Sequence, residues 1–124
     1  MGTKILVVED NPLNLELVRD ILVGAGYEVV EALDGEAGIE IARLEKPSLI
    51  LMDLQLPGLD GLEATRRIRA DPTLAKVPIV ALTAHAMRAE EDRAAEAGCA
   101  GFITKPIRVR EFAGLVASYL RQES

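Results

Sequence analysis

The sequence of 124 residues lacks the features that mark disulfide-rich and membrane-spanning proteins. Its single cysteine, Cys99, excludes an internal disulfide and agrees with a reducing compartment, where we expect it to act as a small buried apolar residue. Tryptophan is absent and there are only two phenylalanines and two tyrosines, so the core must be mainly aliphatic. No apolar run has the length of a membrane span or forms a signal peptide, which predicts a cytoplasmic protein that does not bind a membrane.

Positive charge is also scarce, because 14 lysines and arginines face 20 aspartates and glutamates, for a formal net charge of −6. Nonspecific nucleic-acid binding depends on basic side chains that displace counterions, so no nucleic-acid partner is expected. The composition, 49% hydrophobic and 27% charged, is that of a globular protein, and the length suits one hydrophobic core. We therefore expect a single domain over residues 1–124.

Short apolar runs alternate with longer stretches of helical periodicity. The apolar runs predict strands at 5–8, 29–30, 49–52, 79–82 and 102–103. The intervening stretches predict helices at 12–24, 35–45, 61–70 and 86–97, and a last helix that includes 112–120. Such alternation is typical of an α/β fold, a doubly wound five-stranded parallel sheet. Right-handed crossovers favour the flavodoxin-like strand order 2-1-3-4-5.

The first and last helices have recognisable buried faces. In the first helix we expect Leu13, Leu17 and Ile21 to lie beside Val18 and Leu22. The buried face of the last helix is expected to contain Phe112, Leu115, Val116, Tyr119 and Leu120. Asn11 and Asp60 are expected to be N-caps, because each stands directly before a predicted helix.

Five polar residues stand at the ends of predicted strands. They are Glu9 and Asp10 after the first strand, Asp53 after the third, Thr83 after the fourth and Lys105 after the fifth. The carboxyl ends of parallel strands share one edge of the sheet, which is where such folds bind ligands. Two carboxylates about 4 Å apart repel by about 4 kcal/mol at an effective dielectric constant of 20. The cluster therefore indicates a hard cation, Mg²⁺ or alternatively Mn²⁺, whose coordination leaves room for a phosphate.

Each of these residues also has a structural interpretation. Glu9 or Asp10 could be a helix cap or a solvated loop residue, Thr83 could cap the following helix, and Lys105 could be an ordinary surface lysine. We favour a common site because the predicted fold brings all of them to one edge.

Four motifs occur in fixed order along the chain: VVEDN (7–11), LMDLQLPGLDG (51–61), ALTA (81–84) and TKP (104–106). Together they resemble the CheY-like receiver domains of two-component signalling. EDNPLN (9–14) and VPIVALTAHAM (77–87) are similar to stand-alone regulators of the DivK type and to the receivers of hybrid histidine kinases.

The resemblance implies a function for the cluster. Asp53 matches the phosphoacceptor, which takes a phosphoryl group from a phosphohistidine of a histidine kinase or phosphotransfer protein. Asp10, Asp53 and the backbone carbonyl of Gln55 match the metal ligands, and Glu9 matches the acid that acts through metal-bound water. Thr83 and Lys105 match the groups that hold the phosphoryl oxygens. Pro106 matches a cis-proline.

The resemblance also implies a switch and a partner surface. Thr83 and Phe102 match the switch pair, whereas Gln55 and His85 match positions that tune the lifetime of the phosphoryl group. A downstream protein is expected on the face formed by the fourth helix, fifth strand and fifth helix, where Met87, Arg88, Arg108 and Arg110 lie. Phosphodonor proteins are expected at the first helix, around Leu15 and Arg19. No turnover of an external substrate is expected.

Two other classes fit less well. A small flavin-binding electron carrier would need a phosphate-binding loop after the first strand, but Glu-Asp-Asn-Pro at 9–12 would repel a phosphate. An aspartyl phosphatase would need a second acid two residues after the first, but position 55 is glutamine and the chain is too short for a substrate cap. We expect a stand-alone response regulator; the alternative is a receiver cut from a hybrid kinase that acts in a phosphorelay.

Overall fold

The computed structural model describes residues 3–84 and 87–122. Five parallel strands form one sheet in the order β2-β1-β3-β4-β5, which confirms the predicted topology. The strands are β1 (Lys4–Val8), β2 (Glu28–Ala32), β3 (Leu49–Asp53), β4 (Ile79–Thr83) and β5 (Gly101–Thr104). The helices are α1 (Pro12–Gly24), α2 (Gly35–Glu45), α3 (Gly61–Arg69), α4 (Arg88–Ala97) and α5 (Val109–Gln122), and η1 (Pro72–Leu74) is a short 3₁₀ helix.

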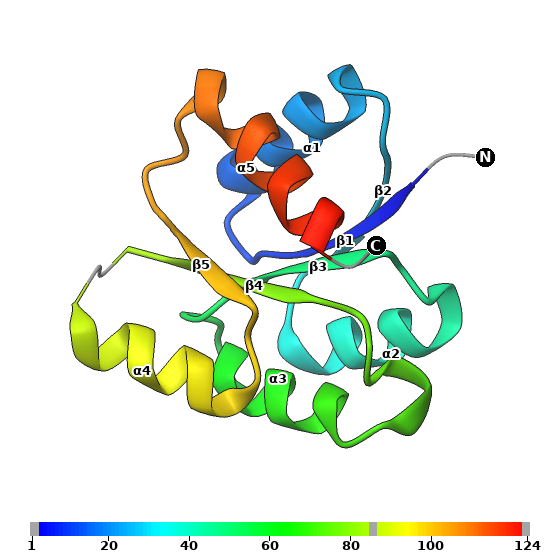
Figure 1. The fold of residues 1–124 in the computed structure, drawn as a ribbon, viewed down its shortest axis with the longest axis vertical. Helices are drawn as coiled ribbons and strands as arrows, with labels where there is room; N and C mark the ends of the chain where they lie inside the picture. The colour runs from blue at the N-terminus through cyan, green and yellow to red at the C-terminus, as the bar shows by residue number, and fades with distance from the viewer. Residues whose placement is uncertain (1–2, 85–86, 123–124) are drawn as a thin grey trace.

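The sheet lies between two layers of helices. Figure 1 shows α1 and α5 over one face and α2, α3 and α4 over the other. Successive side chains of a strand point to opposite faces, so Ile5 and Val7 enter the core under α1 and α5, whereas Leu6 and Val8 enter the core over α2 and α3. The central strands are therefore buried on both faces, which explains why their sequences are apolar throughout.

The register of the strands aligns their carboxyl ends. Val8 at the end of β1 pairs with Met52 of β3, Asp53 pairs with Leu82 of β4, and Thr83 pairs with Thr104 of β5. The residues at and just after these ends consequently meet at one edge of the sheet.

Two positions expected in the core are exposed. Leu13 is 78% exposed, and α1 instead buries Leu15, Val18 and Leu22. At 3.6 residues per turn, Leu13 lies about 200° around the helix from Leu15, so it points away from the sheet. Leu115 on α5 is also exposed, whereas Phe112 and Val116 form the buried face that was predicted.

The helix ends are mostly where the sequence places them. Asn11 accepts hydrogen bonds from the backbone N–H groups of residues 13 and 14, and Asp60 accepts one from residue 63, which confirms both N-caps. Met87 occupies the N-cap position of α4, so the alternative that Thr83 caps this helix is wrong. The expected helix start at Ala86 and the proposed lifetime residue His85 lie outside the described residues.

The sequence interpretation missed the helix η1. Asp71 accepts a hydrogen bond from the Thr73 N–H at 2.9 Å, and Pro72 follows it at the first helical position. An aspartate before a proline is a recognisable signal for such a start. Across the part of the chain that the structure describes, no helix combines the length and apolar character needed to cross a bilayer.

Candidate functional site

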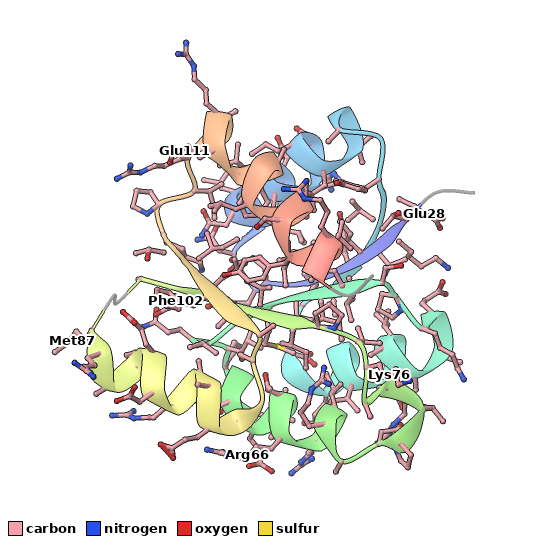
Figure 2. The ribbon with its side chains drawn as sticks, viewed as in Figure 1. Glu28, Arg66, Lys76, Met87, Phe102 and Glu111 are labelled. Atoms are coloured by element: carbon pink, nitrogen blue, oxygen red, sulfur yellow. The ribbon has the colours of Figure 1, made fainter. Side chains whose placement is uncertain are left out.

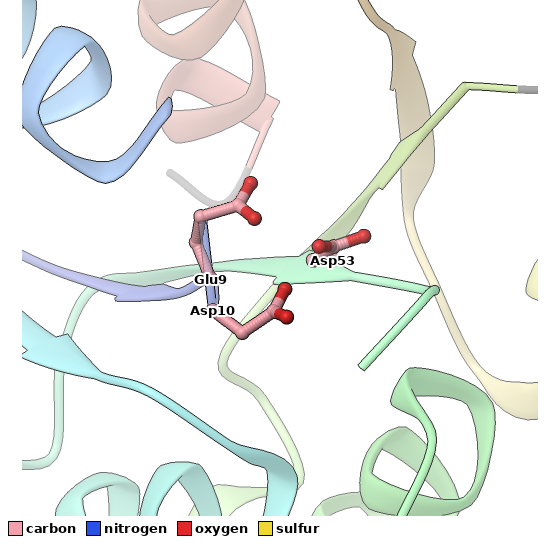
Figure 3. Close-up of side chains that lie close together, drawn as sticks. All are labelled: Glu9, Asp10 and Asp53. Carbon is pink, nitrogen blue, oxygen red and sulfur yellow. The ribbon is translucent and has the colours of Figure 1, made fainter. Parts of the chain in front are cut away.

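Three carboxylates meet at the carboxyl edge of the sheet. Glu9 and Asp10 directly follow β1, and Asp53 is the last residue of β3. One oxygen from each of the three side chains lies within 4.8 Å of the other two (Figure 3). Glu9 is 1% exposed and Asp53 is 2% exposed, whereas Asp10 faces solvent. The fold thus brings together three acids that are separated by up to 44 positions in the sequence.

Lys105 joins this cluster from the segment after β5. Its Nζ lies 2.9 Å from Glu9 Oε1 and 3.2 Å from Asp53 Oδ2, and its side chain is only 16% exposed. The alternative that Lys105 is an ordinary surface lysine is therefore wrong. Burial opposes the ammonium charge, but the hydrogen bond with Glu9 and the charges of both acids outweigh it, so the pKa of Lys105 is raised. The Lys105–Pro106 peptide bond is cis, and the Lys105 N–H donates to the Thr83 carbonyl at 2.7 Å.

The cluster carries more negative than positive charge. Burial is the main cause that raises the pKa of Glu9; a hydrogen bond to Asp53 raises it further, and the hydrogen bond to Lys105 lowers it in part. The cluster contains three carboxylates and one ammonium group, which does not balance their charge. An additional divalent cation would do so, and an all-oxygen set with one exposed carboxylate suits Mg²⁺, which keeps several of its waters.

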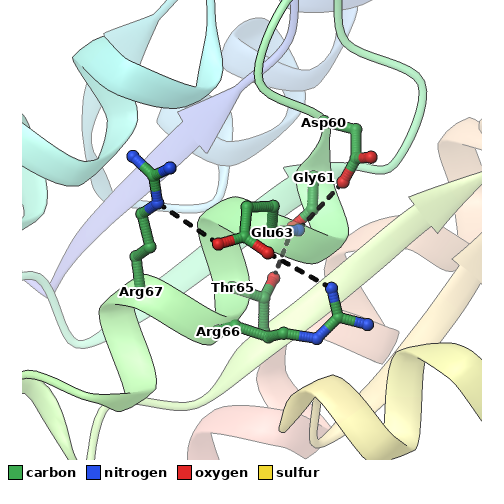
Figure 4. A network of polar contacts seen from close by, with 6 residues as sticks. All are labelled: Asp60, Gly61, Glu63, Thr65, Arg66 and Arg67. Carbon is green, nitrogen blue, oxygen red and sulfur yellow. Dashed lines mark hydrogen bonds and ion pairs between the residues drawn. The ribbon is translucent and has the colours of Figure 1, made fainter.

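The loop that follows Asp53 is held tightly at both ends. The Gln55 N–H donates to Asp53 Oδ1 at 2.9 Å. Gly61 lies so close to the strand end that a Cβ atom there would overlap the Asp53 carbonyl oxygen and lie 2.8 Å from Leu54 Cα. Buried Thr65 fixes the start of α3, because its hydroxyl donates to the Gly61 carbonyl at 2.8 Å (Figure 4). The loop carrying the Gln55 carbonyl is thus anchored next to the acids.

Charged pairs reinforce α3 on its outer side. Glu63 lies 3.4 Å from an Arg66 nitrogen and 3.3 Å from an Arg67 nitrogen, and Asp60 caps the same helix (Figure 4). These exposed ion pairs contribute little individually, whereas the Asp60 cap, the Gly61 contact and the Thr65 hydrogen bond fix the start of α3.

Thr83 and Phe102 lie on the side of the site next to α4. Thr83 is the buried last residue of β4. Phe102 on β5 is half-buried and packs against Leu54, Ala81 and Ala94. It borders two hollows, one of ≈ 290 Å³ beside α4 and one of ≈ 310 Å³ beside α5. Figure 2 shows Phe102 on the same side of the molecule as exposed Met87 at the start of α4.

Backbone contacts around the acids were not foreseen from the sequence. The Asn11 N–H donates to Glu9 Oε2 at 3.2 Å, and the Glu9 N–H donates to the Ala32 carbonyl at 3.0 Å. Gly35 lies against the carbonyl of Leu59 in the loop after β3. One signal was available for it, because Asp34-Gly35 starts α2 in the same way as Asp60-Gly61 starts α3.

Comparison with known proteins gives consistent matches over nearly the whole chain. Residues 5–117 match the family model of the response regulator receiver domain. The chain is 42% identical over 120 residues to the polar-differentiation response regulator DivK of Brucella anthropi, covering 97% of this chain and 98% of that protein.

Solved structures agree with these matches. The receiver domain of the sensor histidine kinase PA1611 of Pseudomonas aeruginosa is 37% identical, with a TM-score of 0.89 and coverage of 97% of this chain and 98% of that chain. That structure holds a magnesium ion in its active-site cleft. The chemotaxis protein CheY4 of Vibrio cholerae has a TM-score of 0.91 at 24% identity, covering 95% of this chain and 98% of that chain, and so shares the fold.

Proposed function

The chain belongs to the response regulator receiver family, and we propose that it accepts a phosphoryl group on Asp53 from a phosphohistidine in a Mg²⁺-dependent reaction. The observation that carries this proposal is the contact of one ammonium group, Lys105, with both Glu9 and Asp53 beside the third acid, Asp10. Phosphoryl transfer depends mainly on positioning and on stabilising the charge of the phosphoryl oxygens, and this cluster is built from groups that do both.

In the proposed reaction the P–N bond of the phosphohistidine breaks as a bond forms between phosphorus and an Asp53 oxygen, and the leaving imidazole takes up a proton from solvent. The Gln55 N–H orients the Asp53 carboxylate through its 2.9 Å hydrogen bond. Lys105 stabilises the negative charge of the phosphoryl oxygens, and the Thr83 hydroxyl donates a hydrogen bond to one of them. The buried position of Asp53 holds the carboxylate in one orientation.

The donor set fits Mg²⁺, with Mn²⁺ as an alternative. Asp10, Asp53 and the Gln55 backbone carbonyl would hold the ion, and Glu9 would act through a bound water. When bound, the ion supplies positive charge that neutralises the acids and the incoming phosphoryl group. The magnesium ion in the PA1611 receiver supports this assignment.

Phosphorylation would then change the surface beside α4, β5 and α5. A phosphoryl group adds a charge of about −1.5 to −2 and three acceptor oxygens, toward which we expect Thr83 to move. Phe102 would turn inward to occupy the vacated space, a change of apolar packing only, because phenylalanine has no hydroxyl. The two hollows beside Phe102 leave space for its side chain to move, which supports this proposed change of packing. A downstream protein would bind this face in preference when Asp53 is phosphorylated.

Two biological settings are compatible with this reaction. We treat residues 1–124 as one receiver domain that acts through protein contacts, with phosphorylation and dephosphorylation of itself as its only chemistry. The match to DivK along 98% of that regulator supports a stand-alone response regulator. The match to the PA1611 receiver supports the alternative, a receiver that relays phosphate within a hybrid kinase system.

The acceptor assignment is tested with a small phosphodonor. With acetyl phosphate and Mg²⁺, intact-mass spectrometry should show one added phosphoryl group on the parent protein and none on Asp53→Asn. Asp60→Asn is the matched control, because asparagine also caps a helix and position 60 is outside the acid cluster. Labelling of Asp53→Asn at the parent level would refute the assignment.

A further inference from the structure

Residues between the end of β2 and the first turn of α2 contact Glu9, its neighbour Val8 and the loop after β3, although none of them belongs to the acid cluster. The Ala32 carbonyl accepts the hydrogen bond of the Glu9 N–H at 3.0 Å. A Cβ atom on Gly35 would lie 2.7 Å from the Leu59 carbonyl oxygen, and one on Gly38 would lie 2.9 Å from Val8 Cγ2. Figure 1 shows the helices α2 and α3 side by side beneath the sheet, which places the start of α2 next to the loop before α3.

The contacts of the two glycines differ in kind. Gly38 faces the buried side chain of Val8, whose Cγ2 and Cγ1 atoms would lie 2.9 Å and 3.2 Å from an added Cβ, and it does not face the loop. Gly35 faces a backbone carbonyl in the loop 54–60, whose ends are held by the Asp53 and Gly61 contact. A side chain at position 35 could therefore be accommodated only if the loop itself moved.

We propose that Gly35 is a positioning residue for the cation site, because its missing side chain lets the loop that carries the Gln55 carbonyl seat against α2. The inference rests on the proposed function, in which that carbonyl is a metal ligand. Groups that orient metal ligands without touching the metal commonly affect affinity, so the contribution of Gly35 should be measurable in Mg²⁺ binding.

The test compares three glycine-to-alanine variants by isothermal titration calorimetry with MgCl₂. For Gly35→Ala we expect the dissociation constant for Mg²⁺ to rise about tenfold. This is the lower end of the loss in metal affinity that follows mutation of groups that orient metal ligands. Gly38→Ala should lower the melting temperature and keep the parent affinity, because its Cβ meets a core side chain and not the loop. Gly114→Ala on α5, where nothing lies within 4 Å, should bind Mg²⁺ as the parent does.

A second readout separates positioning from general damage to the fold. At saturating Mg²⁺, Gly35→Ala should regain the phosphorylation rate of the parent with acetyl phosphate, whereas Asp10→Asn, which loses a ligand charge, should not. A parent-like Mg²⁺ affinity in Gly35→Ala would overturn the inference and leave the proposed function intact. A parent protein that binds no Mg²⁺ would overturn both.

A further variant tests the inference if Gly35→Ala does not fold. Leu59→Gly adds no atoms at position 35, but it makes the backbone more flexible at the residue whose carbonyl contacts Gly35. If the loop must be held there, this variant should also bind Mg²⁺ more weakly than the parent. An unchanged affinity in Leu59→Gly would overturn the inference.

Discussion

Replacement of Asp53 by asparagine should stabilise the metal-free protein against unfolding. Asparagine has almost the same shape as aspartate and can still accept the hydrogen bond of the Gln55 N–H, so packing should be retained. What changes is the charge of a buried cluster in which three carboxylates meet one ammonium group. The variant removes the repulsion of Asp53 by Glu9 and by Asp10, and it also removes the attraction between Asp53 and Lys105.

The distances give the sign and the size of the effect at a pH where Glu9 is ionised. Carboxylate charges about 4.8 Å apart repel by about 3.5 kcal/mol at an effective dielectric constant of 20, and Asp53 has two such neighbours. Its attraction to Lys105 at 3.2 Å is about 5 kcal/mol on the same basis. Asp10 is exposed and partly screened, so we expect a net gain in the free energy of unfolding of about 1–2 kcal/mol.

Urea unfolding followed by far-ultraviolet circular dichroism measures this gain, without Mg²⁺ and at saturating Mg²⁺. Mg²⁺ should stabilise the parent, by about 2.7 kcal/mol when the ion is present at 100 times its dissociation constant, and should stabilise Asp53→Asn much less. Asp60→Asn, an exposed aspartate outside the cluster, should differ little from the parent. A less stable Asp53→Asn in metal-free buffer would refute the reasoning, since it would mean that the Lys105 attraction outweighs both repulsions.

Two further predictions concern pH and the partner surface. Because the pKa of Glu9 is raised above its ordinary value of 4.5, the folded protein retains a proton there that the unfolded chain loses, so the stability of the metal-free protein should fall as pH rises above 4.5. Urea unfolding from pH 4 upward should show this decline in the parent and a weaker one in Glu9→Gln; equal slopes would contradict it. Met87→Ala and Arg110→Ala should weaken binding of the downstream protein, measured with phosphorylated protein, without slowing phosphorylation by acetyl phosphate. Arg19→Ala on α1 is the control, and loss of binding in that variant alone would move the interface to α1.

The family resemblance drawn from four short motifs is confirmed by the matches over nearly the whole chain. The motifs were informative because they surround the ends of strands, and the topology could be derived from the alternation of apolar runs and helical stretches. A parallel sheet places all its carboxyl ends at one edge, so the approximate meeting of Glu9, Asp10, Asp53 and Lys105 followed from the order of the elements alone.

The burial of individual helix faces could be predicted only in part. Phe112 and Val116 are buried as expected, but Leu13 is exposed and Leu15 is buried in its place. The sequence of α1 is apolar at both positions, so its periodicity allows more than one buried face. Packing against the sheet selects one of them.

The sequence by itself therefore determined the sheet order, the family and the residue types at the edge, because these depend on local periodicity and on short motifs. Only the tertiary structure decided that Lys105 contacts Glu9 as well as Asp53, that burial raises the pKa of Glu9, and that Gly35 lies against the Leu59 carbonyl. Each of these depends on distances of a few ångströms between segments that are far apart in the chain. Such distances result from how the two helical layers pack on the sheet; the Asp34-Gly35 pair marks the start of a helix but does not specify which segment it contacts.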